Sequence, residues 1–193
     1  MPESEGDDAL TEHTLESRVA FEGAFLRLYL DRVRSGDGHI GTREYIRHPG
    51  AVMIIPLLPD GRVVLERQFR YPLKRTVIEF PAGKIDAHES PFQCARRELL
   101  EETGYHAGKW SYLGGLHNAI AYSDEKIEMF LAEELVHEGA SLDVGETLEV
   151  FAEQWQQLSQ WVRNGTVTDA KTMLGVLWLE KVLAGEWQRQ RAD

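Results

Sequence analysis

The segment from Gly83 to Tyr105 constrains this chain most, because it carries clear signals for the two ends of a helix. Ser90-Pro91 is typical of a helix start, with Ser90 as the N-cap and Pro91 at the first helical position. Gly104 is typical of a helix end, because glycine readily adopts the left-handed conformation required there. We therefore expect one helix from Pro91 to about Thr103.

Three carboxylates of this expected helix lie on one arc beside its apolar stripe. Glu98 and Glu102 are four positions apart and share a face, and Glu101 lies next to them. Like charges at this spacing repel each other by roughly a few tenths of a kcal/mol on an exposed helix. Two interpretations remain open. A hard divalent cation such as Mg²⁺ binds there, since it prefers oxygen ligands, or the face is solvated and relieved by Arg96 and Arg97.

Charge and cysteine content exclude several classes of protein. The chain has 193 residues and a net charge of −11, which argues against nonspecific nucleic-acid binding. Cys94 is the single cysteine, so an intramolecular disulfide is impossible and a reducing, cytoplasmic location is expected. No nearby base activates Cys94, and we interpret it as structural. The N-terminus does not resemble a signal peptide, and no apolar run is long enough for a transmembrane helix.

Short runs of strand-forming residues predict a mixed α+β fold. Residues 51–57 form a continuous apolar run, as expected of a strand buried on both faces. Further strands are expected over 25–33, 42–48, 62–70, 77–80, 110–116, 127–132 and 148–152, and helices over 154–163 and 169–183. Residues 1–17 carry six acids and no Lys or Arg, which predicts a mobile tail. Residues 18–48 then form an N-terminal β segment, and residues 49–193 form the main domain.

The spacing of the residues around the helix is specific. The pattern G-x5-E-x7-R-E-U-x-E-E-x-G-U, where U is bulky and apolar or aromatic, is matched by Gly83, Glu89, Arg97, Glu98, Leu99, Glu101, Glu102, Gly104 and Tyr105. This resembles the Nudix box, and every position matches. Over about residues 20–185 the chain also resembles the ADP-ribose pyrophosphatase branch of that family, in the segments 43–52, 68–70, 79–83 and 123–125.

The resemblance implies a Nudix fold, in which a mixed sheet is sandwiched between helices and carries an N-terminal antiparallel β extension. The box over residues 83–105 would hold Mg²⁺, with Mn²⁺ as a substitute. Family members hydrolyse a nucleoside diphosphate linked to another moiety, and ADP-ribose would yield AMP and ribose 5-phosphate. In this branch the N-terminal segment reaches a partner subunit, which implies a homodimer.

The resemblance also implies roles for individual residues. Glu98, Glu102 and the backbone carbonyl of Ala82 would be metal ligands, and Glu101 would serve a further cation or support the first. Arg97 and Glu89 would pair and hold the loop, with Gly83 and Gly104 as structural positions in the box. These assignments agree with the chemistry, because cations neutralise the oxygens of a diphosphate and lower the pKa of a bound water.

The general base and the substrate contacts follow less directly from the resemblance. Glu146, in the late loop 143–149, is the best match to a catalytic glutamate, and Glu101 and Glu102 are the alternatives. Arg70 would touch the diphosphate or form a surface salt bridge. Glu79 would orient the terminal ribose or Arg70.

Two further residues are candidates for substrate binding. Arg47 is either a ligand contact or an exposed charge on a strand. Tyr122 would stack on a base or pack within its loop. Both alternatives stay open for each residue.

One position departs from the pattern of the branch. Ile120 stands where a proline is usual, in a loop expected to line the substrate pocket. GDP-mannose, other nucleoside diphosphate sugars and diadenosine polyphosphates therefore remain alternative substrates. A nucleotide-sensing module without catalysis and an interaction protein that uses the acidic tail are the alternatives that are not enzymes. The intact box argues against a sensor.

Overall fold

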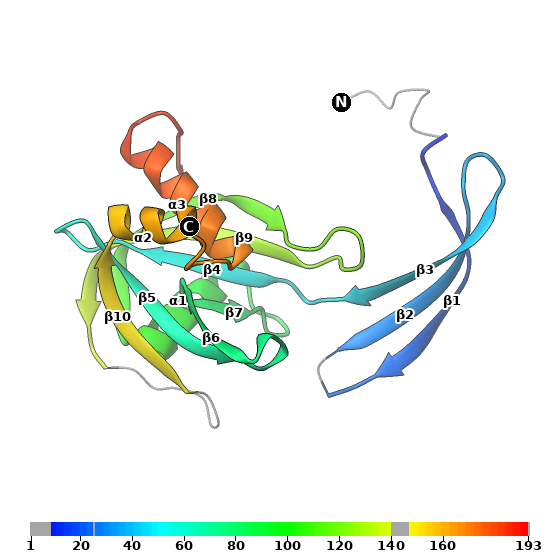
Figure 1. Ribbon diagram of the computed structural model, residues 1–193, viewed down its shortest axis with the longest axis horizontal. Coiled ribbons are helices and arrows are strands. Elements are labelled where there is room, and N and C mark those ends of the chain that lie inside the picture. The colour runs from blue at the N-terminus through cyan, green and yellow to red at the C-terminus, as the bar shows by residue number, and fades with distance from the viewer. Residues whose placement is uncertain (1–8, 25, 140–146, 193) are drawn as a thin grey trace. The chain divides into compact units, whose positions relative to one another are not determined.

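The computed structural model describes residues 9–24, 26–139 and 147–192, which form two compact units (Figure 1). The first unit combines the residues up to His48 with the segment Ala119–Glu125. The second unit contains Pro49–Asn118 and the residues from Lys126 onward. The box helix and both other α-helices belong to the second unit.

The first unit is an antiparallel sheet of β1 (His13–Glu22), β2 (Arg27–Arg34) and β3 (Ile40–Arg47). The segment 119–125 returns alongside β3, where the Ile46 amide donates to the Tyr122 carbonyl at 2.8 Å. The tail predicted to extend to residue 17 is shorter, because β1 begins at His13. Every residue of β1 is exposed, including Leu15, Val19 and Phe21, which lie at alternating positions along the strand, and pairing with β2 defines the strand.

The second unit contains two sheets. A mixed sheet has the strand order β11 (Gln190–Arg191), β8 (Tyr105–His117), β9 (Lys126–His137), β4 (Ala51–Pro56) and β7 (Ala82–Lys84), with β4 and β9 parallel. An antiparallel sheet contains β10 (Leu148–Gln154), β5 (Arg62–Arg70) and β6 (Arg75–Glu79), and a 3-10 turn, η1 (Tyr71–Leu73), joins β5 to β6. Two short strands, β7 and β11, were not predicted, because two or three residues carry no periodic signal.

Alternation along β4 places the helices on opposite faces of the mixed sheet. Val52 and Ile54 pack in one cluster with α1 (Pro91–Thr103), and Met53 and Ile55 pack in another with α2 (Trp155–Arg163) and α3 (Ala170–Leu183). Figure 1 shows α1 and α3 on opposite sides of β4. The prediction of an α+β sandwich around a mixed sheet is confirmed, as is burial of the 51–57 strand on both faces.

The predicted ends of the box helix are also confirmed. The Ser90 hydroxyl accepts from the Gln93 amide at 3.2 Å, and the Gln93 side chain accepts from the Ser90 amide at 2.9 Å. Gly104 adopts φ 73° at the other end. None of the helices in the described residues is long and apolar enough to cross a membrane.

Candidate active site

Two box carboxylates are held against the backbone of β7. Glu102 is 4% exposed, and its Oε2 accepts a hydrogen bond from the Ala82 amide at 3.1 Å. Glu98 lies over Gly83 so closely that a Cβ at residue 83 would stand 1.9 Å from the Glu98 carboxyl carbon. Glycine is therefore required at residue 83 for the carboxylate to lie where it does.

Arg97 connects the loop before the helix with the acidic face of α1. Its Nε and Nη2 donate to Glu89 at 2.9 Å, which confirms the predicted Arg97–Glu89 pair. The same guanidinium uses Nη1 to reach Glu98 Oε1 at 2.8 Å and Glu101 Oε2 at 2.9 Å. The hydrogen bond from Arg97 holds the pKa of the Glu89 carboxyl below its ordinary value.

The box carboxylates do not converge on one point. Within residues 9–24, 26–139 and 147–192, no three His, Cys, Asp or Glu side chains are arranged as ligands of a single ion. Glu98 and Glu101 turn to Arg97 instead, because its guanidinium is the nearest cation. The donor set nevertheless suits a hard divalent cation, since it offers only carboxylate and carbonyl oxygens. One guanidinium also faces four carboxylates, those of Asp86, Glu89, Glu98 and Glu101, so negative charge is in excess.

A second cluster of charges surrounds Glu79, whose side chain is 2% exposed. Arg70 donates to both Glu79 oxygens, from Nε at 2.6 Å and from Nη2 at 2.8 Å. Lys171 Nζ contacts Glu79 as well, and it pairs with Asp169 at 3.0 Å. Burial acts to raise the pKa of Glu79, but the hydrogen bond from Arg70 and the charge of Lys171 outweigh it and lower the pKa. The predicted link between Glu79 and Arg70 is therefore present.

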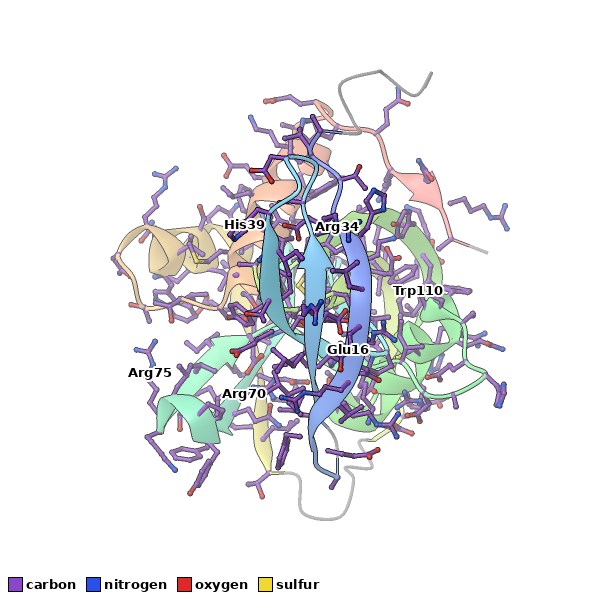
Figure 2. The ribbon with its side chains drawn as sticks, turned by 90° about the vertical axis from the view of Figure 1, so that its right-hand side faces the viewer. Glu16, Arg34, His39, Arg70, Arg75 and Trp110 are labelled. Atoms are coloured by element: carbon purple, nitrogen blue, oxygen red, sulfur yellow. The ribbon has the colours of Figure 1, made fainter. Side chains whose placement is uncertain are left out.

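This Glu79 cluster lines a cavity of about 430 Å³, together with Asn118 and Thr168. Figure 2 labels Arg70, at the end of β5, and Arg75, at the start of β6. Sequence reasoning missed Lys171, which is 92 residues from Glu79 along the chain. One signal for it exists: Lys171 lies in the first turn of α3, two residues after the N-cap Asp169, where the helix dipole disfavours a cation.

The other two predicted substrate residues belong to the first unit. The Arg47 guanidinium lies over the Tyr29 ring at 4.5 Å and donates to the Tyr45 hydroxyl at 3.3 Å. Tyr122 is 59% exposed and is held through its backbone by Ile46. The structure thus brings Arg70 and Glu79 together, and it places Arg47 and Tyr122 in the unit that contains neither of them.

Glu146 lies outside the described residues. Cys94 is free and lies on the completely buried face of α1. Burial is the main cause that raises the pKa of its thiol, and the charges of Glu89 and Glu98 raise it further. The thiol is therefore held in its unreactive protonated form, which agrees with a structural role.

Comparison with known families gives two matches that together span most of the chain. Residues 47–174 match the NUDIX domain, and residues 12–46 match the nucleoside diphosphate sugar hydrolase N-terminal domain. The two matches meet between Ile46 and Arg47, at the end of β3.

Individual relatives agree with these family matches. The chain is 36% identical over 174 residues to an ADP-ribose pyrophosphatase of Bacillus subtilis, covering 89% of this chain and 94% of the relative. It is 32% identical to an ADP-ribose pyrophosphatase of Mycobacterium tuberculosis, covering 95% and 92%. A GDP-mannose pyrophosphatase of Salmonella typhimurium is also 32% identical, covering 76% and 82%. The crystal structure of an ADP compounds hydrolase shares the fold, with a TM-score of 0.83 at 23% identity over 92% and 97% of the two chains.

Proposed function

The chain belongs to the Nudix family, and from that premise we propose that it hydrolyses the diphosphate bond of ADP-ribose to give AMP and ribose 5-phosphate. The observation that carries the proposal is the fixed position of two box carboxylates, Glu98 and Glu102, against the backbone of β7. The relatives named ADP-ribose pyrophosphatase, which cover nearly the whole chain, support the choice of substrate.

We assign the cation site to Glu98, Glu102 and the carbonyl of Ala82, with Glu101 beside them, and propose Mg²⁺ as the ion and Mn²⁺ as a substitute. A bound divalent cation neutralises diphosphate oxygens and lowers the pKa of a water ligand. The chain itself supplies a preorganised, negatively charged face on α1. Arg97 holds that face in place by tying Glu98 and Glu101 to the loop residue Glu89.

A general base must remove a proton from the attacking water, and we propose Glu146 for this role. Its support is the resemblance of loop 143–149 to the catalytic loop of the family. Glu101 and Glu102 are the alternatives, because both carboxylates lie on the same helix as Glu98. Arg70 is proposed to bind the diphosphate, oriented by the buried Glu79. Arg47 and Tyr122 are proposed as further substrate contacts.

GDP-mannose is the second candidate substrate. Two observations favour it: relatives named GDP-mannose pyrophosphatase match at 32% identity, and Ile120 replaces the proline usual in the ADP-ribose branch. Ile120 is 83% exposed, so its side chain is available to contact a substrate or a partner subunit.

A homodimer and a cytoplasmic location complete the proposal. The dimer is supported by exposed apolar side chains on β1, with Val19 44% and Phe21 59% exposed. The location is supported by the cysteine content, since Cys94 is the single cysteine and is buried. Sedimentation of the purified chain over a range of concentrations tests the dimer, and a monomer mass at every concentration would refute it.

A product assay tests the activity directly. Purified protein with Mg²⁺ is offered ADP-ribose, GDP-mannose, UDP-glucose and diadenosine polyphosphates, and products are separated by chromatography. We expect AMP from ADP-ribose, and loss of turnover when Glu98→Gln removes a cation ligand. The matched control is Glu180→Gln, because Glu180 lies on α3 and not on the box helix. Absence of hydrolysis with all four substrates would refute the proposed hydrolase activity.

A further inference from the structure

A basic groove lies between α1 and the edge of the mixed sheet. One cavity of about 750 Å³ is lined by residues that include Phe92, Arg96, Lys109, Trp110, Arg189 and Arg191. A neighbouring cavity of about 450 Å³ shares Arg96, Ala107 and Trp110 with it. We call these two cavities together the Trp110 groove. All of its lining residues belong to the second unit.

The charge of the larger cavity is opposite to that of the whole protein. Four cationic side chains line it and no carboxylate does, although the chain carries a net charge of −11. Two acids lie close by on β9. Glu133 pairs with both Lys109, at 3.0 Å, and Arg189, at 2.5 Å, and Glu134 lies beside Gly108. Two carboxylates near four cations leave the larger cavity with excess positive charge, and the smaller cavity adds Arg97 and Glu138 to the lining.

Arg96 is the cation with the fewest contacts. It is exposed on α1, and the contact that the structure records for it is with the Phe92 ring, 6.0 Å from the guanidinium carbon. The neighbouring Arg97 binds three carboxylates, whereas Arg96 has no acidic partner among the described residues. An arginine with a free guanidinium at the rim of a cavity is suited to bidentate recognition of phosphate.

The floor of the groove is rigid and apolar. Trp110 is 9% exposed, its ring packs edge-on against Phe92 at 5.6 Å, and its Nε1 donates to the Ala107 carbonyl at 3.2 Å. The indole therefore has no free donor and closes the groove from below. Basic groups on the rim of a fixed apolar floor form a concave site that favours a small anion over an extended chain.

The Trp110 groove is separate from the Glu79 cluster. Figure 2 shows Arg70 and Trp110 on opposite sides of the view. The groove shares no lining residue with the Arg70 cavity. The four cations of its larger cavity have no role in the proposed hydrolysis, whereas Arg97, which lines the smaller cavity, belongs to the box.

We propose that the Trp110 groove is a second binding site, for a small molecule that bears at least two phosphate groups, with Arg96 as the main contact. Lys109, Arg189 and Arg191 complete the positive rim. Inorganic polyphosphate and a nucleotide share this chemistry, and the arms of the experiment distinguish them.

The test is calorimetric titration of the full chain in EDTA, so that no divalent cation recruits phosphate to the box. The probes are inorganic tripolyphosphate and ATP. We expect one binding event that weakens with added salt. Arg96→Ala should weaken it at least fivefold, whereas the control Arg163→Ala, an exposed arginine at the end of α2, should not change it. Equal affinities for tripolyphosphate and ATP would indicate that phosphate groups alone account for binding to the groove. Tighter binding of ATP, with the same dependence on Arg96, would indicate that the ligand of the groove is a nucleotide.

Three results would overturn the proposal. They are an absence of binding by the unaltered chain, equal affinities for the Arg96 and Arg163 variants, and a loss that follows Arg70→Gln instead of Arg96→Ala. Circular dichroism checks that each variant is folded. The binding assay measures no hydrolysis, so its result does not depend on whether the proposed substrate is correct. The Arg96→Ala variant should hydrolyse substrate at the normal rate.

Discussion

The acidic face of α1 and the Glu79 cluster both gather charges in the same unit, but their charge balance differs. On α1 one arginine, Arg97, is shared among four carboxylates, which leaves excess negative charge. Around Glu79 two cations, Arg70 and Lys171, face two carboxylates, Glu79 and Asp169. An unbalanced cluster needs an external ion to complete it, whereas in a balanced one the removal of either partner leaves a charge of the other sign uncompensated. The first should therefore govern activity, and the second should govern stability in addition to holding Arg70 for the substrate.

The largest effect is expected on kcat when Glu146, the proposed general base outside the box, is replaced. Glu146→Gln should lower kcat by about 10²- to 10⁴-fold, because that is the range for removal of a general base. Single-turnover kinetics measures the effect, and thermal unfolding should be unchanged. Glu149→Gln is the control, since Glu149 is largely exposed and pairs with Arg67 at 3.0 Å. Normal turnover in Glu146→Gln would show that Glu146 is not the general base. Glu101 or Glu102, on the acidic face of α1, would then be assigned that role.

The contribution of the Glu79 cluster to stability is tested by replacing Lys171 of α3. Lys171→Met leaves the buried Glu79 with only the half-exposed Arg70 as a cation. We expect the free energy of unfolding in urea to fall by about 3 kcal/mol, the lower end of the range for breaking a buried pair. Lys181→Met is the control on the same helix, because its pair with Glu186 is exposed on both sides. That variant should lose much less stability, because solvent screens an exposed ion pair. Equal losses would show that the Glu79 cluster contributes no more than a surface pair.

Gly83→Ala should separate activity from stability within the box. The added methyl group must displace the end of the Glu98 side chain, which is flexible, so the fold should tolerate it. The carboxylate then leaves its place on β7, and we expect kcat/KM to fall by about tenfold or more. Gly41→Ala in β3 is the control, because a Cβ there meets its nearest neighbour at 3.4 Å. Full activity in Gly83→Ala would show that the close approach of Glu98 to residue 83 is not needed for catalysis.

The smallest effect is a change in the dependence of stability on pH. The pKa of Glu79 is lowered in the folded state, so its contribution is present above its ordinary value of 4.5 and is lost as the pH falls through the folded value. The difference in unfolding free energy between the unaltered chain and Glu79→Gln should therefore be largest near neutral pH and shrink below about pH 4.5. Urea unfolding between pH 3 and pH 7 measures it. A difference independent of pH would mean that the charge on Glu79 does not stabilise the fold.

Local signals predicted the box helix to the residue. Ser90, Pro91 and Gly104 act on their immediate neighbours, so the sequence alone defines both ends of α1. The pairing of Arg97 with Glu89 was also predicted, from the family pattern. In contrast, the start of β1 was missed because the acidic residues around it, such as Glu12 and Glu16, were assigned to the tail, although Leu15, Val19 and Phe21 alternate along the strand.

The sequence by itself determined that three carboxylates share one side of a helix, because helical periodicity depends only on spacing along the chain. The same spacing places Arg97 one turn before Glu101 on α1, where the two side chains pair. Only the tertiary structure decided that Glu102 accepts from the Ala82 amide and that Lys171 reaches Glu79 from a helix 92 residues away. These contacts depend on how α1 packs on β7 and how α3 packs on the sheet, and packing brings together residues whose distance along the sequence carries no information about their distance in space.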